Sequence, residues 1–371
     1  MNKQVYIHTA FTILAAKKFV EPLALSLDFN KYDVELWIDP FEGYFNNKAI
    51  FGLPVKYVDM HLTLNFIKSL LKIFKIYTEL KQVRPIVIET HFTMGSFLPL
   101  MAAKVAGIKR RIYHNHGIPF VGYQGIMKWA LYIIEQLNCL LATEVITVSK
   151  GMLKIYSNMF YVNPKIGLAD PGSACGLPDN YYIDLESMPL IKKTAREKNG
   201  FSNDTIFIFV GRAVERKGLL IVIQAFEAYY EQFKNSTLLL AGCTTDDLLK
   251  REISHPKIIA LGFVDDICTY YEMSDVVLLP SMHEGFGYSL LEGAAMGNAL
   301  ISSDILGPDD LVLNGITGYR VKVKCIHSLK DAMIKITKNR EILSKIQYSA
   351  RVHAEKYRRD IVIKNYLKIV E

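Results

Sequence analysis

Short apolar strands alternate with longer helical segments along nearly the whole chain, and this alternation restricts the possible folds more than any other feature. Runs rich in β-branched and aromatic residues predict the strands, and apolar residues at helical spacing predict the helices. The series restarts at a very apolar run, TIFIFVG at 205–211. Strands that are buried on both faces and joined by helices form parallel sheets. The sequence therefore predicts two α/β domains.

The expected elements follow this pattern. The strands of the first half are Gln4–Ile7, Val34–Ile38, Ile86–Glu89, Arg111–Tyr113 and Val145–Val148, with helical patterns over 12–27, 62–82, 93–106 and 122–141. The strands of the second half are 205–211, 236–242, 258–262, 276–280, 299–304 and 318–321. A stretch rich in Pro, Gly and Asp and then a charged stretch separate the two series, which places the boundary near 190–200.

The composition excludes several classes of protein. The chain has 371 residues, of which half are hydrophobic, and its five cysteines are scattered with no C-x-x-C pair. This argues against a disulfide framework or a zinc site and favours reduced thiols in the cytoplasm. The first residues lack an apolar signal core, and no run of about 18 apolar residues occurs, so no membrane span is expected.

The net charge of +7 suits nucleic acid, anionic lipid or an acidic substrate. No nucleic-acid-binding module is recognisable, so no nucleic-acid partner is expected. The basic residues concentrate in 62–84, where Lys68, Lys72, Lys75 and Lys81 alternate with apolar residues at helical spacing. Two interpretations stay open: a helix lying on an anionic membrane surface, or an amphipathic helix packed on a sheet with a solvated basic face.

Two motifs follow predicted strands of the second half. GRAVERKG (211–218) places Arg212 and Lys217 at a strand end, where cations suit a diphosphate, although a solvated basic loop fits as well. In HEGFGYSLLE (283–292), two glycines permit close backbone approach, and a helix that starts near Tyr288 would favour an anion. Glu292 has a second interpretation, because Ser289 and Glu292 fit a capping box.

Two further turns carry candidate residues. Phe263 and Val264 in LGFVDD could flank a flat base, or the segment is an ordinary turn with Asp265 or Asp266 as N-cap. In HNHG (114–117), His114 and His116 share a strand face. They could form a metal pair, although no third ligand is evident, or a histidine there could bind a phosphate or a sugar hydroxyl. D-x-D, P-loop and G-x-S-x-G motifs are absent, which favours metal-independent chemistry.

Taken together, these motifs resemble those of glycosyltransferase family 4, in its bacterial surface-polysaccharide branch. The resemblance is dense over 205–322, where GRAVERKG, GFVDD, HEGFGYSLLEGAAMG and SSDILGPDDLVLNGITGYRV occur in the family's order. It is thinner before that, in HNHG, EVITVS and DPGSACG. The chain departs from the family after its first strand, where HTAFTILAAKK lacks a glycine, and at Gly293, where alanine is usual.

The resemblance implies a GT-B fold: two Rossmann-like domains that face each other across a cleft. An acceptor-binding domain would cover 1–190, a nucleotide-sugar-binding domain 191–355, and a C-terminal helix over 356–371 would return to the first domain.

The resemblance also implies roles for the candidate residues. Glu284 and His116 would act near the transferred sugar, and Arg212 and Lys217 would hold the diphosphate. Glu292 would bind the ribose hydroxyls. The remaining substrate contacts would come from Phe263 and Val264 at the base and from Gly285, Phe286, Gly287, Tyr288 and Ser289 at the sugar and phosphate.

The implied reaction is retaining transfer from a nucleotide diphosphate sugar, with a UDP-linked hexose or N-acetylhexosamine expected, to a hydroxyl of a lipid-linked glycan in O-antigen or capsule assembly. No metal or other cofactor is expected. The expected location is the cytoplasm, with peripheral contact to the inner membrane through 62–84. Three alternatives stay open: a GDP-sugar-dependent mannosyl- or fucosyltransferase, a nucleotide-sugar epimerase of the same fold, and a non-catalytic nucleotide-sugar-binding partner.

Overall fold

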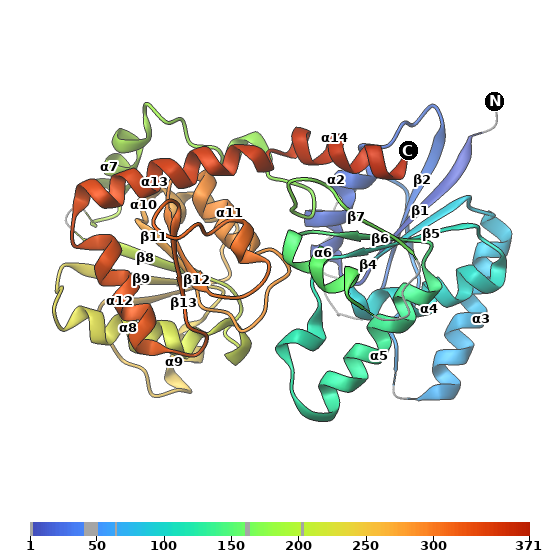
Figure 1. The fold of residues 1–371 in the computed structure, drawn as a ribbon, viewed down its shortest axis with the longest axis horizontal. Helices are drawn as coiled ribbons and strands as arrows, with labels where there is room; N and C mark the ends of the chain where they lie inside the picture. Colours follow the sequence, from blue (N-terminus) through green and yellow to red (C-terminus); the bar gives the residue numbers. More distant parts are fainter. Residues whose placement is uncertain (1–2, 41–50, 64, 160–163, 202–203) are drawn as a thin grey trace. The chain divides into compact units, whose positions relative to one another are not determined.

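A computed structural model describes residues 3–40, 51–63, 65–159, 164–201 and 204–371. The chain forms two compact units (Figure 1). Unit 1 contains Met1–Gly176 and Asp360–Glu371, and unit 2 contains Leu177–Arg359. Each unit is built on one sheet in which all pairings are parallel. The predicted division into two α/β domains is thereby confirmed.

Unit 1 has a seven-stranded sheet in the order β3-β2-β1-β4-β5-β6-β7. The strands are β1 Gln4–Ala10, β2 Tyr32–Ile38, β3 Val55–Tyr57, β4 Val87–His91, β5 Arg110–Asn115, β6 Glu144–Thr147 and β7 Lys165–Leu168. The helices are α1 Ile13–Ala15, the π-helix η1 Ala16–Val20, α2 Glu21–Ala24, α3 Phe66–Val83, α4 Thr93–Ala106, the 3₁₀ helix η2 Pro119–Gly122, α5 Gly125–Leu141, α6 Lys150–Ser157 and α14 Arg359–Val370.

Helices cover both faces of this sheet because successive strand residues point to opposite sides. Tyr6 packs on the face covered by α2 and by α14, which contributes Tyr366. Its neighbour Ile7 packs on the other face, against α3 and α4. The α3, α4 and α5 helices contact one another in that order (Figure 1). Most of the C-terminal helix α14 therefore belongs to unit 1.

Unit 2 has a six-stranded sheet in the order β10-β9-β8-β11-β12-β13. The strands are β8 Thr205–Val210, β9 Ser236–Ala241, β10 Ile258–Gly262, β11 Val276–Leu279, β12 Ala299–Ser303 and β13 Gly318–Val321. The α-helices are α7 Met188–Lys198, α8 Leu219–Tyr230, α9 Thr245–Leu249, α10 Ile267–Met273, α11 Tyr288–Ala295, α12 Ile326–Thr337 and α13 Arg340–Ala354. Short 3₁₀ helices are η3 Asp179–Tyr181, η4 Glu215–Lys217, η5 Pro308–Asp310 and η6 Glu355–Tyr357.

All the predicted strands are present, and two edge strands were missed. The missed strands β3 and β7 have only three and four residues, and none of their residues is fully buried. Short edge strands of this kind carry little apolar signal. The helical pattern at 12–27 forms three short consecutive helical segments, α1, η1 and α2, instead of one α-helix.

The chain changes units at Gly176, before the predicted boundary at 190. The backbone nitrogens of Leu177 and Ile183 already donate hydrogen bonds within unit 2, to Tyr357 at 3.0 Å and Ala295 at 3.1 Å. Among the described residues, no helix is long and apolar enough to cross a membrane.

Candidate functional site

Two loops meet at the carboxyl ends of β8 and β11, which are neighbours in the second sheet. Lys217 lies in the first loop and Glu284 in the second, and Lys217 Nζ donates to Glu284 Oε1 at 2.6 Å. The backbone nitrogen of Met282 donates to the Arg216 carbonyl at 2.9 Å and fixes the loops to each other. The fold thus joins the two motifs that the sequence singled out separately.

The close approach of these loops requires Gly218. Its φ is +80°, and a Cβ built there would overlap the carbonyl oxygen of Pro280. Glycine is the residue that adopts a positive φ without steric cost and leaves room for a neighbouring backbone.

The Lys217–Glu284 pair is largely shielded from water, with side-chain exposures of 21% and 11%. Burial alone would raise the pKa of the Glu284 carboxyl. The charge and hydrogen bond of Lys217 outweigh burial and lower that pKa. Glu284 is therefore an ionised carboxylate at neutral pH, paired with an ammonium. Arg212 is exposed, and within the described part of the chain no carboxylate pairs with it.

Helix α11 begins directly after the second loop, and its N-cap is Gly287, with a φ of +89° and no side-chain cap. The capping-box interpretation of Ser289 and Glu292 was therefore wrong, because Ser289 lies inside the helix. Gly293 lets α11 lie close to the sheet, since a Cβ there would overlap the Val277 side chain. The positive end of the α11 dipole lies at this loop, where it favours an anion.

Glu292 is 2% exposed and accepts a hydrogen bond from the Tyr271 hydroxyl at 3.2 Å. Tyr271 also donates to the carbonyl of Ser289 at 3.1 Å, so it ties α10 to α11. Burial and the neighbouring Glu292 charge raise the pKa of Tyr271 well above its usual value, so its hydroxyl stays a donor. No sequence motif marks Tyr271, which looks like any other aromatic residue in an apolar helix.

Phe263 follows β10 and is 82% exposed, while Val264 is half-buried. Asp266 occupies the N-cap position of α10 but makes no side-chain bond to the helix backbone. It accepts instead from the Thr269 hydroxyl at 2.7 Å. An exposed aromatic ring at a strand end is suited to stacking on a flat base.

His116 lies in unit 1, whereas the other predicted site residues lie in unit 2. A line of imidazoles runs inward from it. The Nε2 of His116 is 3.0 Å from the Nδ1 of His91, and the Nε2 of His91 is 3.2 Å from the Nδ1 of His8. His116 follows β5, His91 is the last residue of β4, and His8 lies within β1; these three strands are neighbours.

A buried carboxylate, Glu89, lies beneath the histidines. It accepts from His114 at 3.0 Å and from the hydroxyls of Tyr6 and Tyr366 at 2.7 and 2.6 Å. Burial would raise the pKa of Glu89, but His8 and His114 lower it overall.

Burial keeps most of these imidazoles neutral. It lowers the pKa of His8 to about 4 and those of His91 and His116 well below the usual value. Sequence reasoning missed His8, Glu89 and His91, because only the strand order brings them to His116.

Among the residues that the structure describes, three groups of side chains place potential metal ligands within 4.8 Å of one another: His91, His114 and His116; His8, Glu89 and His91; and Asp39, Asp59 and His61. The first group supplies the third ligand that the sequence did not reveal. The rings of His114 and His116, however, are stacked with an interplanar angle of 18°. An imidazole holds a metal in its own ring plane, so stacked rings do not converge on one ion. In the third group, Lys72 Nζ already lies 2.6 Å from Asp59.

The loops and helix of unit 2 match a known family. Residues 191–353 fit the family model described as Glycosyl transferases group 1. These matched residues make up most of unit 2. The matched residues include Lys217, Phe263, Glu284 and Glu292.

Curated relatives extend the likeness beyond these residues. The chain is 25% identical over 298 residues to the capsular polysaccharide biosynthesis glycosyltransferase CapM of Staphylococcus aureus, covering 78% of this chain and 76% of the relative. It is 25% identical over 305 residues to the UDP-Gal:alpha-D-GlcNAc-diphosphoundecaprenol alpha-1,3-galactosyltransferase of Escherichia coli, covering 76% and 74%. The prediction of a hexosyltransferase enzyme is confirmed by these matches.

A solved structure supports the fold over the whole length. Anabaena Alr3699/HepE in complex with UDP and glucose aligns with a TM-score of 0.78, at 15% identity, over 99% of each chain. This likeness concerns the fold alone, and it confirms the predicted GT-B class.

Proposed function

We propose that the chain is a retaining glycosyltransferase of family 4. It moves a hexosyl or N-acetylhexosaminyl unit from a UDP-sugar to a hydroxyl of a lipid-linked glycan, during assembly of a bacterial surface polysaccharide. The observation that carries the proposal is the Lys217–Glu284 pair of 2.6 Å beside the start of α11. A cation, a carboxylate and the positive end of a helix dipole at one sheet edge suit a sugar diphosphate.

The relatives support the finer parts of the proposal. CapM is named for capsular polysaccharide biosynthesis. The E. coli relative is named for a UDP-Gal donor and a diphosphoundecaprenol-linked acceptor. The HepE structure contains UDP and glucose.

In the proposed mechanism, Arg212 and Lys217 stabilise the negative charge that develops on the leaving diphosphate, together with the first N–H groups of α11. The bond from the anomeric carbon to the phosphate oxygen breaks while the acceptor oxygen bonds to the same face. The acceptor proton moves to the departing phosphate oxygen, so no protein nucleophile is needed. Glu284 lies beside the positive charge that develops at the anomeric carbon. Such preorganised electrostatic stabilisation is usually the largest catalytic term.

The nucleoside would lie over β10 and α11. Phe263 and Val264 would contact the base, and Glu292 would accept hydrogen bonds from the ribose hydroxyls. The backbone of Gly285, Phe286, Gly287, Tyr288 and Ser289 would bind the sugar and the phosphates. His116 of unit 1 would donate to the donor sugar or phosphate through a neutral imidazole, the form that burial favours.

We also propose that the reaction needs no metal. The protein cations Arg212 and Lys217 lie where an ion would otherwise neutralise the diphosphate. The stacked rings of His114 and His116 do not converge on one ion.

We further propose peripheral contact of α3 with the cytoplasmic face of the inner membrane. One surface of this helix exposes Phe66, Ile67, Leu71 and Phe74, each between 64% and 74%. Lys68 and Lys75 are exposed on the same helix. A helix with exposed apolar residues flanked by lysines is suited to an anionic lipid surface.

Lys72 takes no part in that surface. Its ammonium pairs with Asp59 and contacts His61 Nε2 at 3.0 Å, and its side chain is 13% exposed. The sequence pattern places Lys72 with the other lysines on one basic helix surface, and the structure corrects this for Lys72.

The test begins with a thermal-shift panel of UDP-, GDP- and dTDP-sugars. A ligand at about 100 times its dissociation constant adds about 2.7 kcal/mol of stability. We expect a UDP-sugar to give the largest shift.

A second experiment tests the stereochemistry of transfer. The same UDP-sugar, supplied with a short-chain polyprenyl diphosphate sugar as acceptor, should yield a product whose anomeric configuration, determined by NMR, matches that of the donor. Inversion would refute the retaining mechanism, and an epimeric donor formed without acceptor would indicate an epimerase.

A further inference from the structure

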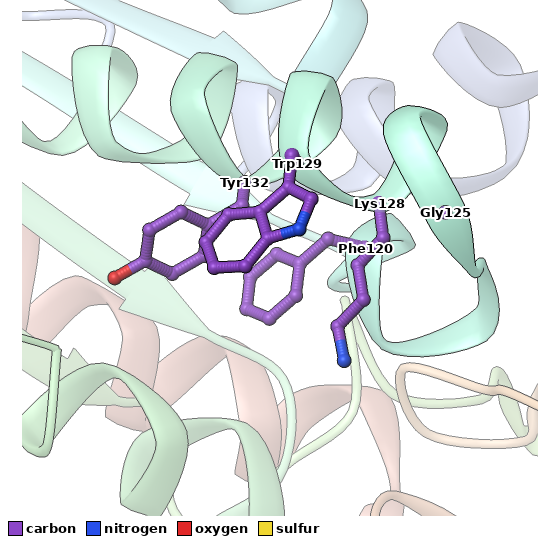
Figure 2. A pocket seen from close by; sticks show the side chains of 5 residues that line it. All are labelled: Phe120, Gly125, Lys128, Trp129 and Tyr132. Atoms are coloured by element: carbon purple, nitrogen blue, oxygen red, sulfur yellow. The ribbon is translucent and has the colours of Figure 1, made fainter.

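Unit 1 has an aromatic hollow that the proposed donor site does not use. It has a volume of about 370 Å³ and is lined by Phe120 of η2 and by Gly125, Lys128, Trp129 and Tyr132 of α5 (Figure 2). The Phe120 and Tyr132 rings are 5.1 Å apart between centroids, with an interplanar angle of 85°. Trp129 and Tyr132 are 6.0 Å apart, at 83°. The three rings therefore support one another in a fixed arrangement.

The exposure of this region is unusual for a helix in a globular domain. Trp129 is 65% exposed, and the nearby Ile126, Met127 and Ile133 are 88%, 51% and 56% exposed. Large apolar side chains gathered in this way at a surface indicate an interaction site. The chain's other tryptophan, Trp37, is fully buried. The first turns of α5 thus present apolar and aromatic groups that the fold of unit 1 does not use.

The charge of the hollow favours an anion. Lys128 and Glu135 are the charged residues of segment 117–141. Glu135 lies further along the same helix and is fully buried, where it accepts from Tyr113 at 2.8 Å and from Asn115 at 3.0 Å. Across the described residues, no carboxylate pairs with Lys128. The ammonium is therefore the net charge that the hollow presents to a ligand.

The position of the hollow links it to the ligand-binding edge. Phe120 comes four residues after His116, just beyond the carboxyl end of β5. Parallel α/β sheets bind ligands at this edge. Helix α3 also follows a strand of the same sheet, so its exposed first turns lie toward the same edge.

We propose that this hollow binds the sugar diphosphate of the lipid-linked acceptor. This deepens the proposed function and rests on it. The C–H face of the lipid-proximal sugar stacks on Trp129, and a phosphate oxygen accepts from the Lys128 ammonium. Ile126 and Met127 contact the lipid next to it. Small-molecule pockets measure roughly 300–1,000 Å³, so this volume suits one sugar with a phosphate rather than a long glycan.

The first test measures acceptor affinity without any donor. The fluorescence difference between the wild-type protein and Trp129→Phe isolates the signal of Trp129. It is recorded against a water-soluble short-chain polyprenyl diphosphate sugar, the same polyprenyl phosphate without sugar, and phosphatidylglycerol vesicles without acceptor. We expect the Trp129 fluorescence to change and to saturate with the polyprenyl diphosphate sugar. The concentration that gives half of this change should be at least tenfold lower than for the polyprenyl phosphate without sugar. An equal response to plain vesicles would show that the hollow only anchors the protein in lipid and would overturn the proposal.

The second test measures turnover. Trp129→Ala and Lys128→Ala should each raise KM for the acceptor about tenfold, because each removes one direct contact to it; tenfold corresponds to about 1.4 kcal/mol. The thermal shift produced by the donor should stay unchanged. Leu140→Ala, on the same helix with a 49% exposed side chain, is the matched control. An unchanged KM for the acceptor in both variants would refute the proposal.

The two tests separate this proposal from the proposed function. If no nucleotide sugar binds or is transferred, the donor chemistry is wrong, whereas the fluorescence titration still reports on the hollow. If transfer proceeds normally in Trp129→Ala, the function stands and the hollow is not the acceptor site.

Discussion

Lys217 Nζ lies 2.6 Å from Glu284 Oε1, and this ion pair joins two loops that are 67 residues apart in the sequence. The pair exists because β8 and β11 are neighbours, so both loops leave the same edge of the second sheet. Removing either partner would leave a largely buried charge without compensation, which is costly. The same pair provides the cation that the proposed mechanism needs at the diphosphate.

Replacing Lys217 by alanine should lower kcat by about 10²–10³, because it removes a group that stabilises the leaving diphosphate. Arg212→Ala should have an effect of the same size, and Lys217→Arg should restore part of the rate. The measurement is release of the free nucleotide under saturating substrates. Lys234→Ala, an exposed lysine of the same unit, serves as control. Near-normal turnover in both alanine variants would sink the assignment of the diphosphate site.

Gly218→Ala should destabilise unit 2 more than Gly262→Ala. Both glycines have a positive φ, of +80° and +66°, so each alanine costs about 1–2 kcal/mol in the backbone. At Gly218 the added Cβ also overlaps the Pro280 carbonyl, whereas at Gly262 nothing lies within 4 Å. Forced overpacking adds about 1–3 kcal/mol. Urea unfolding of the two variants gives the comparison, and equal losses would contradict the packing argument.

Charge reversal on α3 should weaken membrane association. Each lysine near an anionic surface contributes about 1 kcal/mol, so Lys68→Glu with Lys75→Glu should reduce binding to phosphatidylglycerol vesicles at least about 30-fold. Vesicle sedimentation measures the change. Lys104→Glu, an exposed lysine in the last turn of α4, is the control and should bind like the wild type. Unchanged binding of the double variant would count against the membrane surface.

Acid should destabilise unit 1 well above the range where carboxylates titrate. Burial lowers the pKa of His8 to about 4 in the folded state, against about 6.5 in the unfolded chain. The unfolded state therefore binds more protons between these values, and stability falls as the pH drops from 6.5 to 4. The loss from this one group is about 3 kcal/mol.

Urea unfolding between pH 4.5 and pH 7.5 measures this dependence. Its slope should become shallower in His8→Gln, because that variant removes one buried imidazole but leaves Glu89, His91 and His114, the titratable groups that act on it. His327→Gln, an exposed histidine of unit 2, should leave the slope unchanged. An identical slope in His8→Gln would show that the imidazole cluster does not control acid stability.

Local patterns were enough to predict much of this protein. The apolar run of β8 and the helical periodicity of α3 predict these elements directly. The buried face of a strand takes every second residue and that of a helix every third or fourth, so the spacing of apolar residues within one element is enough. The glycines and cations of the two unit 2 loops were also evident, since each lies just after a predicted strand. All of these predictions depend only on residues that are close together in the sequence.

The tertiary structure decided which of those residues meet. Lys217 pairs with Glu284, and Tyr271 with Glu292, only because their elements are neighbours in unit 2. The line from His116 through His91 to His8 depends in the same way on the order of three strands in unit 1. Lys72 looked equivalent to Lys68 in the periodic pattern, yet it turns to Asp59. Strand order and side-chain partners are set by contacts between distant segments, and the periodicity of one segment contains no record of its partner.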